Sequence, residues 1–124
     1  MYIALVLDEQ SKKELLQAFP PRFPDVIGHH ITLTFGVSKN VNLPPQPTDV
    51  KVVGCAINDD GIEALVVSVN DKTKRADGST YHITWSIDRS KGFKPADSNT
   101  LLVGGGYQSI DTPVEINTEI KLLK

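Results

Sequence analysis

Two copies of one short pattern place residues that can move protons beside residues that can donate hydrogen bonds. They are His-Ile-Thr-Leu-Thr-Phe at 30–35 and His-Ile-Thr-Trp-Ser-Ile at 82–87. Polar and apolar residues alternate in both, which is the period of a half-buried β-strand. His30 and Thr32 should therefore share one face of a strand, and so should His82 and Thr84. We call these two segments the H-x-T strands.

The apolar positions of the H-x-T strands should anchor them in a core. These positions are Ile31, Leu33, Phe35, Ile83, Trp85 and Ile87. Thr34 and Ser86 continue the polar faces, where we expect them to orient the histidines beside a substrate. His29 is adjacent to His30 and so should point to the opposite face of the strand. We interpret His29 as structural or exposed.

Two imidazoles that face each other across a groove suit the cleavage of a phosphodiester by in-line displacement. An unperturbed histidine titrates near pH ~6.5, so near neutrality one can be the neutral base and the other the protonated acid. The hydroxyls of Thr32 and Thr84 could donate to the non-bridging oxygens, whose negative charge must be held in the transition state. This scheme needs no metal. A metal site on His29, His30 and His82 is the weaker alternative, because no carboxylate lies at ligand spacing.

Length and composition indicate one globular domain over residues 1–124. The chain has 40% hydrophobic and 23% charged residues, ordinary values for a domain that can bury a core. Its net charge of -2 argues against coating duplex DNA. The apolar run at 2–7 is too short for a signal peptide or a membrane span, and the single Cys55 cannot form an internal disulfide. We expect a cytoplasmic protein without a membrane partner and leave its oligomeric state open.

The remaining pattern indicates strands joined by turns. We expect strands at 2–7, 30–37, 49–58, 62–70, 81–88 and 114–122. The turn Asn58-Asp59-Asp60-Gly61 favours a hairpin, because Asn, Asp and Gly tolerate the positive φ that tight turns require. Antiparallel pairing should dominate, which predicts an α+β fold.

Helical periodicity is confined to two short stretches. An apolar stripe over 12–19 predicts one helix, with Asp8 or Ser11 as its N-cap and two prolines directly after it. A second short helix fits 96–103. The three glycines at 104–106 are interpreted as a turn and not as a phosphate-binding loop, because no Lys-Ser or Lys-Thr pair follows them.

The paired motifs resemble the signature of a known family. H-x-[ST] motifs on two β-strands, separated by several tens of residues, are characteristic of the 2H phosphoesterase superfamily, and the strand–helix opening of this chain is similar to that of the family. Tyr81 and the second motif, followed by Lys-Pro-Ala-Asp-Ser-Asn at 94–99, resemble the cyclic phosphodiesterase portion of fungal-type tRNA ligases. Lys94 and Ser98 become candidate site residues through this resemblance alone.

The resemblance implies a two-lobed antiparallel β-sheet fold in which each lobe gives one H-x-T strand to a central groove. It also implies an enzyme that hydrolyses 2′,3′-cyclic phosphates, at RNA 3′ ends or on nucleotides, to 2′-phosphates without a metal or cofactor. Carried over by position, His30 and His82 would be the general acid/base pair. Thr32 and Thr84 would donate to the phosphate oxygens.

Other residues are candidates for binding the nucleotide. Tyr81, just before the second motif, and Tyr107 could stack on a base. Arg75 belongs to a small basic stretch at 72–75 that could contact phosphate or RNA. A solvated loop is the alternative interpretation of that stretch.

Two further functions stay open. Small 2H proteins from phages, which this chain resembles in size and in its motif pair, degrade cyclic oligonucleotide immune signals. A 3′,3′-linked cyclic oligonucleotide is therefore a second substrate class, opened by the same two histidines. The third hypothesis is a nucleotide-binding module that turns nothing over.

Overall fold

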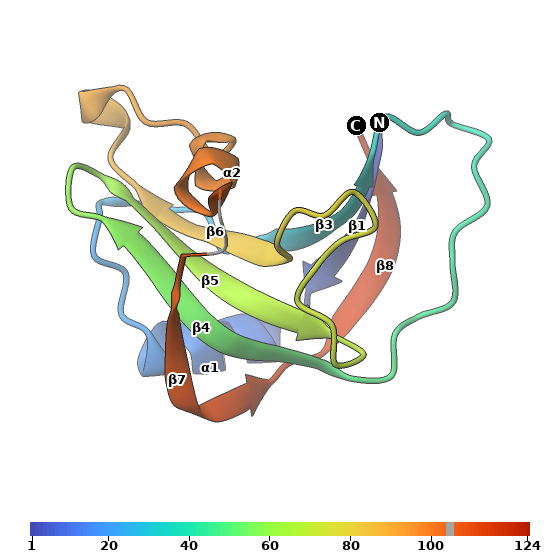
Figure 1. Cartoon of the computed structure of the whole chain (residues 1–124), viewed down its shortest axis with the longest axis horizontal. Coiled ribbons are helices and arrows are strands. Elements are labelled where there is room, and N and C mark those ends of the chain that lie inside the picture. Colours follow the sequence, from blue (N-terminus) through green and yellow to red (C-terminus); the bar gives the residue numbers. More distant parts are fainter. Residues whose placement is uncertain (104–105) are drawn as a thin grey trace.

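The computed structural model describes residues 1–103 and 106–124 of the chain. Within these ranges it shows an α+β fold with an eight-stranded antiparallel sheet, which confirms the predicted fold class (Figure 1). The strands are β1 (Tyr2–Leu7), β2 (Asp25–Val26), β3 (His30–Phe35), β4 (Val50–Asn58), β5 (Ile62–Val69), β6 (His82–Ile87), β7 (Gln108–Glu115) and β8 (Thr118–Leu123). The helices are α1 (Glu9–Ala18), the 3-10 helix η1 (Arg89–Lys91) and α2 (Asp97–Leu101).

The two H-x-T strands, β3 and β6, are neighbours in the middle of the sheet. The strand order is β7-β4-β5-β6-β3-β1-β8, and the short β2 pairs with β6. The first and last strands, β1 and β8, pair along their length, so the two ends of the chain lie side by side (Figure 1). Both motifs therefore lie on interior strands.

The two α-helices cover opposite faces of the sheet (Figure 1). The helix α1 begins after Asp8, whose side chain accepts a hydrogen bond from the backbone N of Ser11 at 2.7 Å, as an N-cap does. Its Leu15 is fully buried in the main core. On the other face, Leu102 at the end of α2 packs against Val66 of β5. No helix of the described residues is long and apolar enough to cross a membrane.

The strand β5 is buried along its whole length because both of its faces are covered. Leu65 points into the main core under α1, and Val66 points into a smaller core under α2. Trp85, on the neighbouring β6, is the largest fully buried side chain and donates its indole N–H to the carbonyl oxygen of Phe19 at 2.8 Å. Burial of such large apolar groups is the main stabilising contribution, about 25 cal/mol per Å². The strand β6, which carries the second motif, is thus held by the buried strand β5 beside it and by the packing and hydrogen bond of Trp85.

The strand β3 departs from strict alternation at a β-bulge. Its partner β1 pairs with Thr32 and then directly with Thr34, so Leu33 is an extra residue in the strand. An extra residue shifts the phase of all later side chains. Thr34 consequently turns to the core face, and Phe35 turns to the face of His30. Phe35 is 52% exposed there, which corrects the expectation that it packs in the core.

The strand β6 has the same bulge at the equivalent residue of the second copy. Its partner β5 pairs with Thr84 and then directly with Ser86, so Trp85 is the extra residue. Ser86 therefore shares the core face with Trp85, and Ile87 shares the face of His82. The two copies of the motif thus share a β-bulge as well as a sequence pattern, and the bulge cannot be recognised from the sequence.

The C-terminal region contains two strands where the sequence pattern predicts one. The alternation at 114–122 covers the end of β7, a two-residue connection at Ile116 and Asn117, and most of β8. Most of β7 is exposed and the strand contains Pro113, so its first residues lack the apolar alternation that identifies a strand. Of the three glycines expected to form a turn at 104–106, the first two lie outside the described residues.

The strands β4 and β7 approach closely at Gly54. A Cβ atom there would lie 2.6 Å from Cδ2 of Tyr107 and 2.8 Å from the carbonyl oxygen of Gln108. We expect Gly54→Ala to lower the free energy of unfolding by about 1–3 kcal/mol, because the β7 backbone would have to move. Gly106→Ala is the control, since nothing lies within 4 Å of a Cβ atom at that position. Urea denaturation compares the variants, and equal stability would contradict the close packing of β7 on β4.

Candidate active site

The two motifs meet where β3 and β6 pair. Ile31, the central residue of the first motif, is the antiparallel partner of Ile83, the central residue of the second. Both isoleucines are fully buried on the core face, so the residues on either side of them point to the opposite face. In such a pair the two histidines are diagonal neighbours, with Cα atoms about 7–8 Å apart. Four predicted residues thus share one face: His30, Thr32, His82 and Thr84.

His82 is buried, and both of its ring nitrogens have partners. Its Nδ1 lies 2.8 Å from the carbonyl oxygen of Thr80, so Nδ1 carries the hydrogen and Nε2 of the neutral ring carries the lone pair. Nε2 lies 3.0 Å from Oγ of Ser98. These contacts fix the ring and direct Nε2, the atom that can exchange a proton with a ligand, toward α2.

Ser98 of α2 connects the second motif to the helix that covers it. Its Oγ lies 3.0 Å from Nε2 of His82, 2.7 Å from Oγ1 of Thr84 and 2.7 Å from the carbonyl oxygen of Pro95. His82 and Thr84 therefore converge on one oxygen atom. If Nε2 is protonated, both side chains can donate to an oxygen of a phosphate at that position. In the sequence, only the resemblance at 94–99 pointed to this serine.

His30 is half-buried beside two other rings. Its Nδ1 lies 3.0 Å from Nδ1 of His29, and its ring centroid lies 5.3 Å from that of Tyr2. His29 is exposed, as expected, but it reaches back to His30 and so belongs to the surroundings of the site. Sequence reasoning missed Tyr2, because nothing in a short apolar run marks one position as the neighbour of a distant histidine.

Burial keeps both histidines neutral near pH 7. It is the main cause that lowers the pKa of His30 to about 4, and repulsion from His29 and from His82 lowers it further. Burial also lowers the pKa of His82; the hydrogen bond to Thr80 opposes this effect and the charge of Arg75 adds to it. The influence of His82 on His30 means that the two imidazoles interact electrostatically. A bound anion would favour the charged rings and raise both pKa values.

Arg75 is buried beside His82, whereas Lys72 and Lys74 of the same basic stretch are exposed, as the alternative of a solvated loop predicts. Its Nη2 donates to the carbonyl oxygen of Thr80 at 3.3 Å and to Oδ1 of Asn99 at 3.2 Å. The same Nη2 lies 3.4 Å from Nδ1 of His82. Burial lowers the pKa of the guanidinium, although an arginine stays protonated in proteins. Arg75 therefore places a positive charge directly against the second motif.

A row of side chains connects Arg75 to the first motif. The guanidinium carbon of Arg75 lies 5.2 Å from the ring centroid of Phe35, within the range of a cation–π contact. Phe35 in turn packs against Tyr2, with ring centroids 6.0 Å apart, and Tyr2 packs against His30. The bulge in β3 makes this row possible, because it turns Phe35 to the face of the histidines.

Thr34 and Ser86 do not reach the histidines, because the two bulges turn them to the core face. Thr34 pairs with Ile3 of β1. Ser86 is fully buried and donates to Oε1 of Glu63 at 2.6 Å. The same carboxylate oxygen accepts a hydrogen bond from the backbone N of Arg22. The alternation that predicted Thr34 and Ser86 as neighbours of the histidines is therefore interrupted before it reaches them.

Three other residues that we expected to contact the substrate have other neighbours in the structure. Tyr81 is the preceding residue of the chain and packs against the main core. Tyr107 packs against the smaller core, where it touches Gly54. Lys94 is exposed in the loop before α2, and its backbone N donates to Asp97. The structure groups both tyrosines with the cores and not with the histidines.

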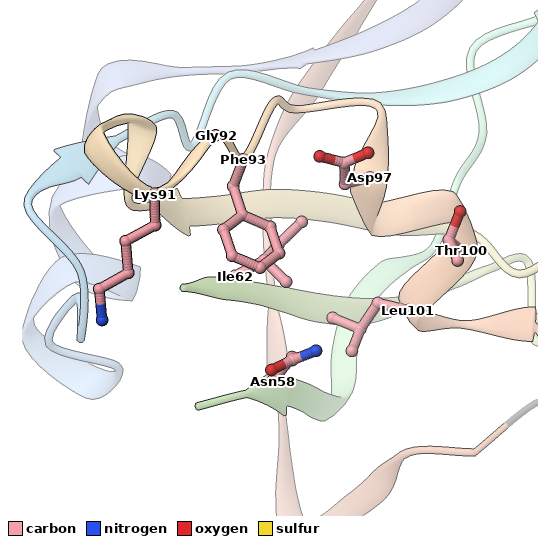
Figure 2. A pocket seen from close by; sticks show the side chains of 8 residues that line it. All are labelled: Asn58, Ile62, Lys91, Gly92, Phe93, Asp97, Thr100 and Leu101. Carbon is pink, nitrogen blue, oxygen red and sulfur yellow. The ribbon is translucent and has the colours of Figure 1, made fainter. Parts of the chain in front are cut away.

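A cavity of about 290 Å³ adjoins the second motif. Its walls come from the loop at 74–80 and from the end of α2, and they include Lys74, Arg75, Thr80, His82, Asn99 and Leu102. Two larger clefts, of about 600 Å³ and 670 Å³, have no histidine among the described residues that line them. Figure 2 shows the first of these, with Ile62, Phe93 and Leu101 on its walls. The cavity beside the histidine is the smallest of the three.

Metal sites in proteins are usually built from three or more His, Cys, Asp or Glu side chains. The part of the chain that the structure describes contains no such group. Metal-independent chemistry stays a prediction.

Comparison with known proteins does not assign the chain to a family. No protein-family model, no curated protein sequence and no solved structure matches the chain. The resemblance to the 2H phosphoesterase superfamily is therefore a hypothesis that depends on the two motifs and on the geometry above.

The histidine environments predict a pH dependence that NMR can measure. The ring of His30 should titrate with a midpoint at about 4, and the ring of His82 should titrate below the ordinary 6.5. The two histidines bind protons at higher pH in the unfolded chain than in the folded chain. Their contribution to the free energy of unfolding is therefore complete above pH ~6.5 and is lost as the pH falls toward ~4. A midpoint of His30 at or above 6.5 would contradict the buried site.

Proposed function

We propose that this chain is a metal-independent phosphodiesterase that hydrolyses 2′,3′-cyclic phosphates of RNA ends or nucleotides to 2′-phosphates. The observation that carries the proposal is the convergence of Nε2 of His82 and Oγ1 of Thr84 on one oxygen atom, at 3.0 and 2.7 Å. The face on which they converge is shared with His30 and Thr32, through the pairing of β3 with β6.

The reaction requires that one proton is taken and one is given on opposite sides of phosphorus. One imidazole, in its neutral form, accepts a proton from water as the water oxygen attacks phosphorus. The other, in its protonated form, donates to the 3′ oxygen as the P–O3′ bond breaks, which leaves the phosphate on the 2′ oxygen. Thr32 and Thr84 donate to the non-bridging oxygens as their negative charge grows.

An anionic substrate supplies the protonated partner. In the free site both histidines have a lowered pKa, so neither is charged near pH 7. A phosphate against the rings favours the imidazolium form and raises the pKa of the ring it touches. The acid therefore forms when the substrate is in place, and His30 and His82 can then differ in charge as the reaction requires.

Ser98 Oγ occupies the position that this proposal assigns to a phosphate oxygen. Each neutral hydrogen bond that the serine gives up contributes about 0.5–1.5 kcal/mol, whereas a hydrogen bond to a charged group contributes about 1.5–3 kcal/mol. A phosphate therefore competes favourably with the serine hydroxyl. The helix α2 has only 5 residues and is the element that shifts when the substrate enters.

The finer fold that we propose is two-lobed. The strands β7, β4, β5 and β6 form one half of the sheet, and β3, β1 and β8 form the other. Between β3 and β6 the paired residues are Ile31 and Ile83. Each half contributes one H-x-T strand at its inner edge, which supports a substrate groove along the junction.

A 3′,3′-cyclic oligonucleotide is the second candidate substrate. The same acid/base pair would open it. The buried positive charge of Arg75 beside His82 suits this candidate as well as it suits an RNA end, because both carry more than one phosphate.

The proposal is tested by cleavage, in EDTA, of an oligonucleotide that ends in a 2′,3′-cyclic phosphate, beside 3′,3′-cyclic di- and trinucleotides. We expect the 2′,3′ ring to be opened, with kcat/KM lower by about 10²–10⁴ in His30→Ala and in His82→Ala. Circular dichroism checks that both variants are folded. Turnover that requires a divalent metal would refute the mechanism. Cleavage of the macrocycles alone would select the second candidate, and no turnover at all would leave a binding module.

Thr32 and Thr34 provide a matched pair of hydroxyls on one strand. They lie on opposite faces because of the bulge at Leu33. Thr32→Val should lower kcat by about 10²–10³, the usual loss when one donor to a developing negative charge is removed. Thr34→Val should keep kcat within about a factor of two, since its hydroxyl faces away from the substrate. Equal losses in the two variants would show that the side-chain phase after the bulge is wrong.

A further inference from the structure

We propose that the cavity on the Nδ1 side of His82 is an anion site, built around Arg75, that binds a second phosphate of the substrate. The inference rests on the proposed function for the identity of the phosphate that is cleaved. It narrows the substrate class to oligonucleotides, linear or cyclic. A nucleoside 2′,3′-cyclic monophosphate carries a single phosphate and could not fill both positions.

Arg75 is a buried cation that makes no ion pair in the described ranges, and the attraction of Asp77 raises the pKa of its guanidinium less than burial lowers it. The residue is 4% exposed, and its Nε and Nη1 have no hydrogen-bond partner among the residues that the structure describes. Its Nη2 donates only to neutral oxygens, those of Thr80 and Asn99. A buried charge that is left unpaired destabilises a fold strongly. Such a charge points to an anionic ligand that completes it.

The acidic residue of the cavity, Asp77, attracts the guanidinium of Arg75 but makes no hydrogen bond or ion pair with it in the described ranges. Asp77 lines the cavity, but its exposed carboxylate accepts hydrogen bonds from the backbone N and the hydroxyl of Ser79. It makes no ion pair with Arg75 among the ion pairs of residues 1–103 and 106–124. Lys74 also lines the cavity. The walls thus carry two positive charges and one negative charge, which favours an anion.

The cavity has room for a phosphate group, and its lining suits one. Its volume of about 290 Å³ is at the lower end of small-molecule sites, which span about 300–1,000 Å³. Ser79 and Asn99 add a hydroxyl and an amide to the charged groups. Arginine pairs with phosphate oxygens through charge-assisted hydrogen bonds, and Nε and Nη1 of Arg75, which are buried in the free chain, make none among the described residues.

The ring of His82 separates this site from the reacting phosphate. Arg75 lies 3.4 Å from Nδ1 of the ring, whereas Ser98 and Thr84 gather at Nε2. The described residues that line the cavity include His82 but not Thr84 or Ser98. An anion held by Arg75 is therefore a different group from the one held by Thr84. A chain of two nucleotides can place one phosphate at each.

Binding of inorganic phosphate tests the anion site without any turnover. Phosphate added to the intact chain should shift the NMR signals of the Arg75 Nε and of the backbone amides of Ser79 and Asn99, which line the cavity. Arg75→Gln should abolish the shifts of Ser79 and Asn99, even where phosphate still binds at Nε2 of His82, and Arg75→Lys, which keeps the charge, should retain them at lower affinity. Arg89→Gln removes an exposed arginine outside the cavity and should respond as the wild type does. No response in the wild type, or an unchanged response in a folded Arg75→Gln, would overturn the inference.

Substrate preference tests whether the bound phosphate belongs to the substrate. The two substrates are adenosine 2′,3′-cyclic phosphate and a dinucleotide that ends in the same ring. We expect kcat/KM of the wild type to be about 10- to 100-fold higher on the dinucleotide, and Arg75→Gln to reduce this ratio at least about tenfold. If Arg75→Gln does not fold, Arg75→Lys should reduce the ratio in the same direction.

The outcomes separate the two proposals. Turnover with an unchanged substrate ratio in the Arg75 variants would overturn the second-phosphate site and leave the proposed function. Phosphate binding that depends on Arg75, without turnover of either substrate, would overturn the proposed function and leave the anion site.

Discussion

The pairing of Ile31 with Ile83 is the constraint on which the rest of the site depends. These two buried residues hold β3 against β6 in one register. A slip of one residue would turn every side chain of a strand to the other face and would bury the histidine and threonine of that motif in the core. Packing on the core face, above all that of Trp85 with its hydrogen bond to Phe19, stabilises this register. The chemistry of one face is thus set by the packing of the other.

Burial also determines the charge of the face that carries the motifs. The structure gathers there two imidazoles with lowered pKa values and a guanidinium whose Nε and Nη1 have no hydrogen-bond partner among the residues described. A bound anion would stabilise the protonated form of each histidine and would pair with the guanidinium of Arg75. The protein therefore holds its positive groups in place before a ligand arrives, as a preorganised phosphate site requires.

Residue types and spacing were sufficient to predict the α+β fold class, most strands, the hairpin at β4 and β5, and the face that the histidine and threonine of each motif share. They were not sufficient beyond the bulges, because an apolar residue such as Leu33 or Trp85 fits either phase of the strand. For this reason Thr34 and Phe35 exchanged faces relative to the prediction. The burial of Arg75 was not predictable either, since it arises from a tertiary contact between its loop and α2 that leaves no local pattern.

A double-mutant cycle tests most directly whether His30 and His82 act as one acid/base pair. It compares kcat/KM for a 2′,3′-cyclic phosphate in the wild type, in each single alanine variant and in the double variant. Residues that act as a unit lose their effect together. We therefore predict that the double variant loses no more activity than the more damaged single variant. Losses that add on a logarithmic scale would mean two independent contributions and would contradict a shared mechanism.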